Sequence, residues 1–182
     1  AQHLTEQGFA VEGKDVNMTW RDVANMVSGY TRAEAPGAAW AYNDFGIELF
    51  KEALKAAQGH TPMQQLFDAG FAALQLEDAP TFDNRDRLYI SPRDFARLGL
   101  LWLREGAWGG SVVLEPQILG QLMRPYVPSA TPRTAAPSPR GDYLGIGSFG
   151  GTSDQSPHGP GHYGYTWWFN RPVTGGALAW PS

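Results

Sequence analysis

The sequence predicts an α+β protein, with a mainly helical part over residues 1–124 and the start of a mostly antiparallel sheet over residues 163–182. Capping residues and apolar positions at helical spacing dominate the first range, whereas the second opens on alternating aromatic residues, as a strand does. Between them, residues 125–162 are rich in Pro, Gly and Ser and predict a long loop. A length of 182 residues fits one domain. We expect residues 1–182 to form a single incomplete domain, because a lone hairpin is marginal in water.

Start and stop signals in the sequence predict the bounds of the first two helices. Thr19 opens a capping box, and the helix behind it is expected to stop near Ser28-Gly29. The next helix is expected to begin at Asn43 or Asp44, where apolar residues at helical spacing start, and to end at Gly59.

Three later helices follow from similar signals. Thr61 and Ser91 each stand one residue before a proline, which predicts capped helices with proline in the first position. Gly106 is expected to close the helix that Ser91 opens. Residues 115–123 predict a last, short helix.

Aromatic residues mark the predicted start of the sheet. One strand face would carry four of them: Tyr163, Tyr165, Trp167 and Phe169. Residues 174–176 predict a turn, and residues 177–180 a returning strand. Such an aromatic face could stack on sugars, but it is more often the core side of a strand.

Composition excludes several classes of partner. The net charge is −4, the pI is near 5.5, and no basic patch interleaves with the aromatic residues, so we expect no nucleic-acid partner. No apolar run reaches the roughly 18 residues that a membrane span needs, so we expect no membrane span. The chain has no cysteine, which excludes disulfides and thiolate chemistry. We expect no cofactor.

The candidate site lies where a Pro-Gly turn and a Trp-x-Tyr pair lead into a helix. Tyr42, Asn43 and Asp44 place a phenol and two short polar side chains at this junction, beside the unpaired N–H groups and positive dipole end of the helix. A phenol there can transfer protons if its surroundings lower its pKa from about 10. The alternative is a half-buried packing tyrosine followed by ordinary Asn-Asp capping.

Four blocks, in order along nearly the whole chain, resemble one known family. They are residues 18–30, residues 36–46, residues 91–99 continuing to 106–110, and residues 161–168. Together they resemble the serine β-lactamase and penicillin-binding-protein-like hydrolases, in the branch of class C β-lactamases and related esterases. The resemblance implies a β-lactamase/DD-peptidase-like fold, a helical subdomain with part of an antiparallel sheet.

The resemblance also implies a mechanism and a substrate class. A serine would attack a small-molecule or peptide acyl substrate, and Tyr42 would relay protons as a phenolate or as a hydrogen-bond bridge. Asn43 and Asp44 would contact the substrate, although Asp44 stands where the family usually has Asn. No serine has lysine three residues later, and the late Lys-Thr-Gly or His-x-Gly motif is missing as well. We therefore expect a central piece of such an enzyme, inactive alone, from a periplasmic or extracellular parent.

Two other functions stay open. One is a non-catalytic domain derived from this fold that binds peptidoglycan or carbohydrate. The other is a hydrolase centred on residues 146–162, with a Ser148/His158/Asp154 triad or with a metal held by His158, His162 and Asp154. The His-Gly-Pro-Gly-His spacing is uncommon for metal ligands, so no metal is expected.

Overall fold

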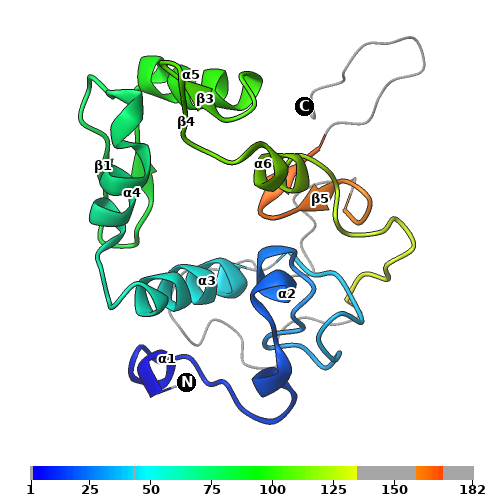
Figure 1. Cartoon of the computed structure of the whole chain (residues 1–182). Coiled ribbons are helices and arrows are strands. Elements are labelled where there is room, and N and C mark those ends of the chain that lie inside the picture. Colours follow the sequence, from blue (N-terminus) through cyan, green and yellow to red (C-terminus); the bar gives the residue numbers. More distant parts are fainter. Residues whose placement is uncertain (1, 43, 135–158, 170–182) are drawn as a thin grey trace. The chain divides into compact units, whose positions relative to one another are not determined.

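The computed structural model describes residues 2–42, 44–134 and 159–169 (Figure 1). The elements, in chain order, are α1 (Gln2–Glu6), η1 (Gly13–Asn17), α2 (Trp20–Ala24), α3 (Asp44–Ala57), α4 (Met63–Phe71), η2 (Ala72–Leu74), β1 (Thr81–Phe82), β2 (Leu88–Tyr89), α5 (Pro92–Leu103), β3 (Ala107–Trp108), β4 (Ser111–Val112), α6 (Pro116–Leu122), β5 (Tyr163–Gly164) and β6 (Trp167–Trp168). The strands form three antiparallel two-residue pairs, β1 with β2, β3 with β4 and β5 with β6. The described part is therefore α+β, with helices and small antiparallel pairs.

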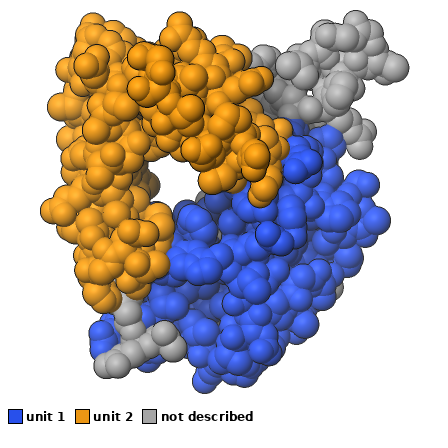
Figure 2. All heavy atoms as spheres, in the orientation of Figure 1, with its two compact units in different colours: residues 1–53, 124–182 blue, residues 54–123 orange. Residues whose placement is uncertain are grey.

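The chain divides into two compact units, coloured separately in Figure 2. Unit 1 comprises residues 1–53 and 124–182, and unit 2 comprises residues 54–123. Within the described ranges, no helix is both long and apolar enough to cross a membrane.

In unit 1, α2 begins as predicted and ends earlier than predicted. The Thr19 hydroxyl accepts the Asp22 N–H, and the Asp22 carboxylate accepts the Thr19 N–H at 2.9 Å, which confirms the capping box. The helix ends at Ala24 rather than near residue 28, because Met26 adopts a left-handed φ of 58°. The Val27 N–H then reaches back to the Asp22 carbonyl at 2.9 Å, as in a Schellman ending.

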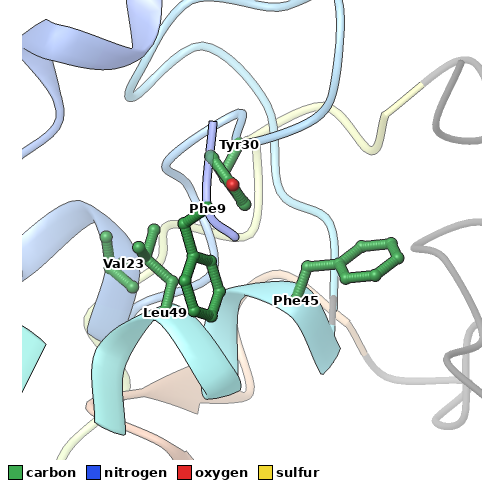
Figure 3. Close-up of a cluster of buried hydrophobic side chains, with 5 residues drawn as sticks. All are labelled: Phe9, Val23, Tyr30, Phe45 and Leu49. Carbon is green, nitrogen blue, oxygen red and sulfur yellow. The ribbon is translucent and has the colours of Figure 1, made fainter. Parts of the chain in front are cut away.

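Helix α3 begins at Asp44, one of the two predicted starts, and turns an apolar face inward. Its Phe45 and Leu49 pack with Val23 of α2 and with Phe9 and Tyr30, which come from loops (Figure 3). The Phe9 and Tyr30 ring centroids are 6.4 Å apart. All five side chains are buried, and each contributes roughly 1.5–3 kcal/mol by leaving water.

In unit 2, the predicted caps are confirmed for one helix and wrong for another. The Ser91 hydroxyl accepts the Asp94 N–H at 3.1 Å, and Pro92 occupies the first position of α5. At α4 the N-cap is Pro62, without a side-chain cap, because the Thr61 hydroxyl donates instead to the Gln58 carbonyl. Helix α6 lies inside the predicted range 115–123.

A buried carboxylate organises the start of α5. Asp94 is fully buried, and its two oxygens accept the backbone N–H groups of Glu77 and Asp78 at 2.9 and 2.8 Å. The carboxylate therefore ties the segment before β1 to the first turn of α5. Buried N–H groups that lose an ionised acceptor are costly to leave unpaired.

We predict that Asp94→Asn lowers the free energy of unfolding by about 2–3 kcal/mol, because the amide can accept only one of the two N–H groups as well as before. Urea unfolding followed by circular dichroism measures the change. Glu115→Gln is the control, since this exposed residue precedes α6 without a side-chain cap, and its change should stay within about 0.5 kcal/mol. Equal stabilities for Asp94→Asn and the parent chain would contradict this role.

Candidate active site

Backbone hydrogen bonds fix the segment that leads to the candidate tyrosine. The Trp40 N–H donates to the Pro132 carbonyl at 2.8 Å, and the Trp40 carbonyl accepts the Thr134 N–H at 2.9 Å. The Ala41 N–H donates to the Met26 carbonyl at 2.9 Å. These bonds hold the backbone just before Tyr42 to residues 132–134 and to Met26. Helix α3 begins two residues after Tyr42.

Tyr42 lies on a cluster of aromatic rings. Its ring centroid is 5.5 Å from Trp168, tilted by 32°, and 6.1 Å from Tyr163, nearly perpendicular to it. Trp40 contacts Tyr163 and Trp168 edge to face, with centroids 5.9 and 5.8 Å away. We call Trp40, Tyr42, Tyr163 and Trp168 the aromatic cluster. Tyr42 is partly buried and Trp168 is 36% exposed, so the cluster reaches the surface of unit 1.

The surroundings of Tyr42 favour its neutral form. Burial raises the pKa of the Tyr42 phenol, and the negative charge of Asp44 raises it further. The condition for proton transfer by a phenolate, surroundings that lower this pKa, is therefore not met by burial and Asp44. The helix N-terminus would favour a phenolate, but burial and a carboxylate two residues away outweigh it.

Tyr163 is the second phenol of the cluster and is harder to ionise than Tyr42. Its side chain is fully buried, and its pKa is raised mainly by that burial and then by the charge of Tyr42. Its hydroxyl has no hydrogen-bond partner among the described residues, and the same holds for the indole N–H of Trp40. Two polar atoms of the cluster are thus buried without a described partner, and Tyr42 is the phenol that ionises first.

A side chain from α2's C-terminal end holds the hairpin that carries Tyr163 and Trp168. The Asn25 carboxamide oxygen accepts the Tyr165 N–H at 2.8 Å, and its amide nitrogen donates to the Arg21 carbonyl at 2.8 Å. Beside it, the Ala24 carbonyl accepts the Thr166 N–H at 2.9 Å. Asn25 itself is fully buried.

The predicted single strand through residues 163–169 is wrong. The chain reverses at Tyr165 and Thr166, whose φ values of 48° and 68° make a two-residue turn with both residues left-handed. Tyr163 pairs with Trp168 across the resulting hairpin. Non-glycine residues adopt this conformation at a cost, which is offset by the hydrogen bonds that the Tyr165 and Thr166 N–H groups donate to Asn25 and Ala24.

Some of the other residues predicted to bind substrate, to form a triad or to hold a metal lie outside the described part of the chain. Asn43, Asp154, Ser148 and His158 lie outside the described residues, as do the predicted turn and strand at 174–180. His162 is buried, and its Nδ1 lies 3.1 Å from the Phe169 carbonyl oxygen within the hairpin. Among the described residues, no three His, Asp or Glu side chains are grouped to hold a metal ion.

A cavity of about 330 Å³ lies in unit 2, between α4 and residues 72–80. Phe67 and Phe71 form part of its wall with ring centroids 5.0 Å apart, and Asp68 at its edge accepts the Gln64 amide at 2.9 Å. The candidate residues at 42 and 44 do not line it. Its lining therefore adds no group to the chemistry at Tyr42.

The described elements define this chain as an α+β protein with an aromatic cluster around a partly buried tyrosine. Comparison with family models, with curated proteins and with solved structures finds no match. The candidate function therefore rests on the residues and their geometry.

We predict that Asp44→Asn lowers the pKa of Tyr42 toward its ordinary value of about 10, because removing a negative charge makes the phenolate less unfavourable. Asparagine has nearly the same shape as aspartate, so the first turn of α3 should be kept. The titration is read from the ¹³C shift of the Tyr42 ring carbon that bears the hydroxyl. Glu48→Gln, which removes a carboxylate that is paired with Lys51, should leave the Tyr42 pKa unchanged. A Tyr42 pKa that rises in Asp44→Asn would contradict this electrostatic balance.

We predict that Asn25→Leu lowers the free energy of unfolding by about 1–3 kcal/mol, because the Tyr165 N–H and the Arg21 carbonyl lose their partner. The near-ultraviolet circular dichroism of the aromatic cluster should also change, since the hairpin loses its support. Asn17→Leu, at an exposed position of unit 1, is the matched control. If both variants unfold alike and keep the parent spectrum, Asn25 does not hold the hairpin.

Proposed function

We propose that this chain supplies the tyrosine-bearing part of a serine acyl hydrolase of the β-lactamase, DD-peptidase and esterase type, with the corresponding fold. The observation that carries the proposal is the position of Tyr42. It stands at the loop-to-helix junction that the resemblance requires, partly buried on the aromatic cluster and not sealed in a core. Its pKa is raised by burial and by the charge of Asp44, and ionisable groups perturbed by both burial and a charged neighbour are frequent at functional sites.

In the proposed reaction a serine hydroxyl attacks the acyl carbon of the substrate, and the leaving group departs with a proton. Water then hydrolyses the acyl-serine ester and returns the serine hydroxyl. Because the pKa of Tyr42 is raised, its neutral phenol suits a hydrogen-bond bridge, which accepts a proton from one side as it donates one to the other. This supports the bridging role over the phenolate role.

The serine of this proposal is not among the 182 residues, because no Ser-x-x-Lys occurs in them. The chain alone is therefore expected to show no turnover. Asp44 would contact the polar part of the substrate, and Asn43 would do so by its place in the motif. The family's usual export suggests a periplasmic or extracellular parent.

A second candidate function is a non-catalytic domain that binds carbohydrate or peptidoglycan. The exposure of Trp167 and Trp168, 41% and 36%, favours it, because an exposed indole can stack on a sugar ring. Such a domain would keep the aromatic cluster and would have no need of the Tyr42 hydroxyl.

We predict that the reading frame around these residues encodes a Ser-x-x-Lys upstream and a Lys-Thr-Gly or His-x-Gly downstream, and that its full product hydrolyses p-nitrophenyl esters or nitrocefin. Tyr42→Phe should lower kcat/KM by about 10²–10⁴-fold, the range for one proton-transfer group. Tyr89→Phe, at an exposed tyrosine, is the control.

A full product that binds sugars without hydrolysing either substrate would favour the second candidate. Unchanged hydrolysis in Tyr42→Phe would exclude the proposed proton relay.

A further inference from the structure

We infer that the cavity in unit 2 binds an arylalkyl ammonium compound, an aromatic ring joined by a short chain to a positively charged amine. The cavity holds about 330 Å³ and lies between α4 and residues 72–80. This volume is at the lower end of the roughly 300–1,000 Å³ found for small-molecule sites, so it admits one ring with a short side chain. Every residue that lines it belongs to unit 2, so the site is independent of Tyr42 and of the proposed function.

One face of α4 forms the first wall of the cavity. Four residues at helical spacing line it from this face: Gln64, Phe67, Asp68 and Phe71. The Phe67 and Phe71 ring centroids are 5.0 Å apart, and Phe82 of β1 packs edge to face on Phe67 with centroids 5.5 Å apart. The aromatic wall is therefore ordered before a ligand binds, so that holding another ring costs little side-chain freedom.

The segment that follows η2 forms the second wall and is bent. Gln75 and Ala79 line the cavity there with left-handed φ values of 49° and 48°, a conformation that non-glycine residues adopt at a cost. Between them, the buried Asp94 carboxylate accepts the N–H groups of Glu77 and Asp78 at 2.9 and 2.8 Å and holds the bend. The chain therefore keeps a strained backbone around this space, and such strain is frequent at ligand sites.

The polar side chains of α4 offer the cavity acceptors and a negative charge. The Gln64 amide nitrogen donates to one Asp68 carboxylate oxygen at 2.9 Å and to the Pro80 carbonyl at 3.0 Å, which uses both of its hydrogens. The carboxamide oxygen of Gln64 and the second carboxylate oxygen of Asp68 can only accept. Of the described residues that line the cavity, Asp68 alone is charged, and its amide partner is neutral. An ammonium, which donates hydrogen bonds and carries a positive charge, is complementary to both side chains.

Arg97 is a cation that contacts the second wall, and its charge is already matched. Its guanidinium donates to the Leu74 carbonyl at 3.1 Å and to the Gln75 carbonyl, and it is paired with the Glu77 carboxylate. Arg97 does not line the cavity. Charge complementarity therefore favours a cationic ligand, whereas a ligand held by Arg97 would have to be an anion.

Three matched probes test this preference on the 182-residue chain at neutral pH. Phenethylamine carries an ammonium, 2-phenylethanol carries a neutral donor, and 3-phenylpropionate carries a carboxylate. Shifts of the backbone amide signals of residues 64–80 in ¹H–¹⁵N spectra give the dissociation constants. We expect phenethylamine to bind about two- to fivefold more tightly than 2-phenylethanol, the size of one exposed ion pair, and 3-phenylpropionate to bind most weakly. Added salt should reduce the advantage of the amine, because it screens the exposed Asp68 carboxylate.

Two pairs of variants assign the preference to a residue and the binding to the cavity. Asp68→Asn keeps an acceptor for the Gln64 amide and should give phenethylamine the affinity of 2-phenylethanol, whereas Glu115→Gln, outside the lining, should change neither. Ala72→Leu enlarges an exposed residue of the lining and should weaken all three probes by about tenfold, because the added carbons occupy the cavity. Ala73→Leu, at the exposed neighbour that does not line the cavity, should leave binding unchanged.

Loss of the amine's advantage in Asp68→Asn, together with weaker binding in Ala72→Leu, would establish the site. The site is overturned if no probe shifts these signals at about 20 mM, if the amine keeps its advantage in Asp68→Asn, or if 3-phenylpropionate binds best. Equal binding by Ala72→Leu and Ala73→Leu would overturn it as well.

Discussion

The site depends on one long-range interaction, the hydrogen bond from the Tyr165 N–H to the buried carboxamide of Asn25. The bond links the end of α2 to a turn 140 residues later, and the neighbouring bond from the Thr166 N–H to the Ala24 carbonyl strengthens the link. Both turn residues are left-handed without being glycine, so the turn needs this support. The hairpin that it holds brings two aromatic rings against Tyr42.

This arrangement decides the chemistry open to Tyr42. Rings on two sides exclude water from part of the phenol, and a carboxylate close by adds negative charge, so both effects favour the neutral form. A neutral phenol can accept and donate a hydrogen bond at once, which suits a bridge between a nucleophile and a leaving group.

The sequence predicted the features that depend on interactions between residues close together in the chain. The capping box at Thr19, the cap at Ser91 and the start of α3 at Asp44 involve residues a few positions apart, and they are confirmed. The hairpin turn was missed because Tyr-Thr lacks the Asn-Gly signal of such turns, and its support lies far away in sequence. One local signal for the early end of α2 was present at Asn25, because asparagine is unfavourable inside a helix and the predicted helix continued past it. The pKa of Tyr42 depends on its burial against Trp168, which spacing in the sequence does not reveal.

The contact between the rings of Tyr42 and Trp168 is the most direct test of this account. With centroids 5.5 Å apart, nuclear Overhauser effects should connect the Tyr42 ring protons with the indole protons of Trp168, and they should weaken in Asn25→Leu. Their presence in the parent chain is the predicted result. Their absence in a folded chain whose α2 and α3 are intact would show that the hairpin does not meet Tyr42, and the site proposed here would not exist.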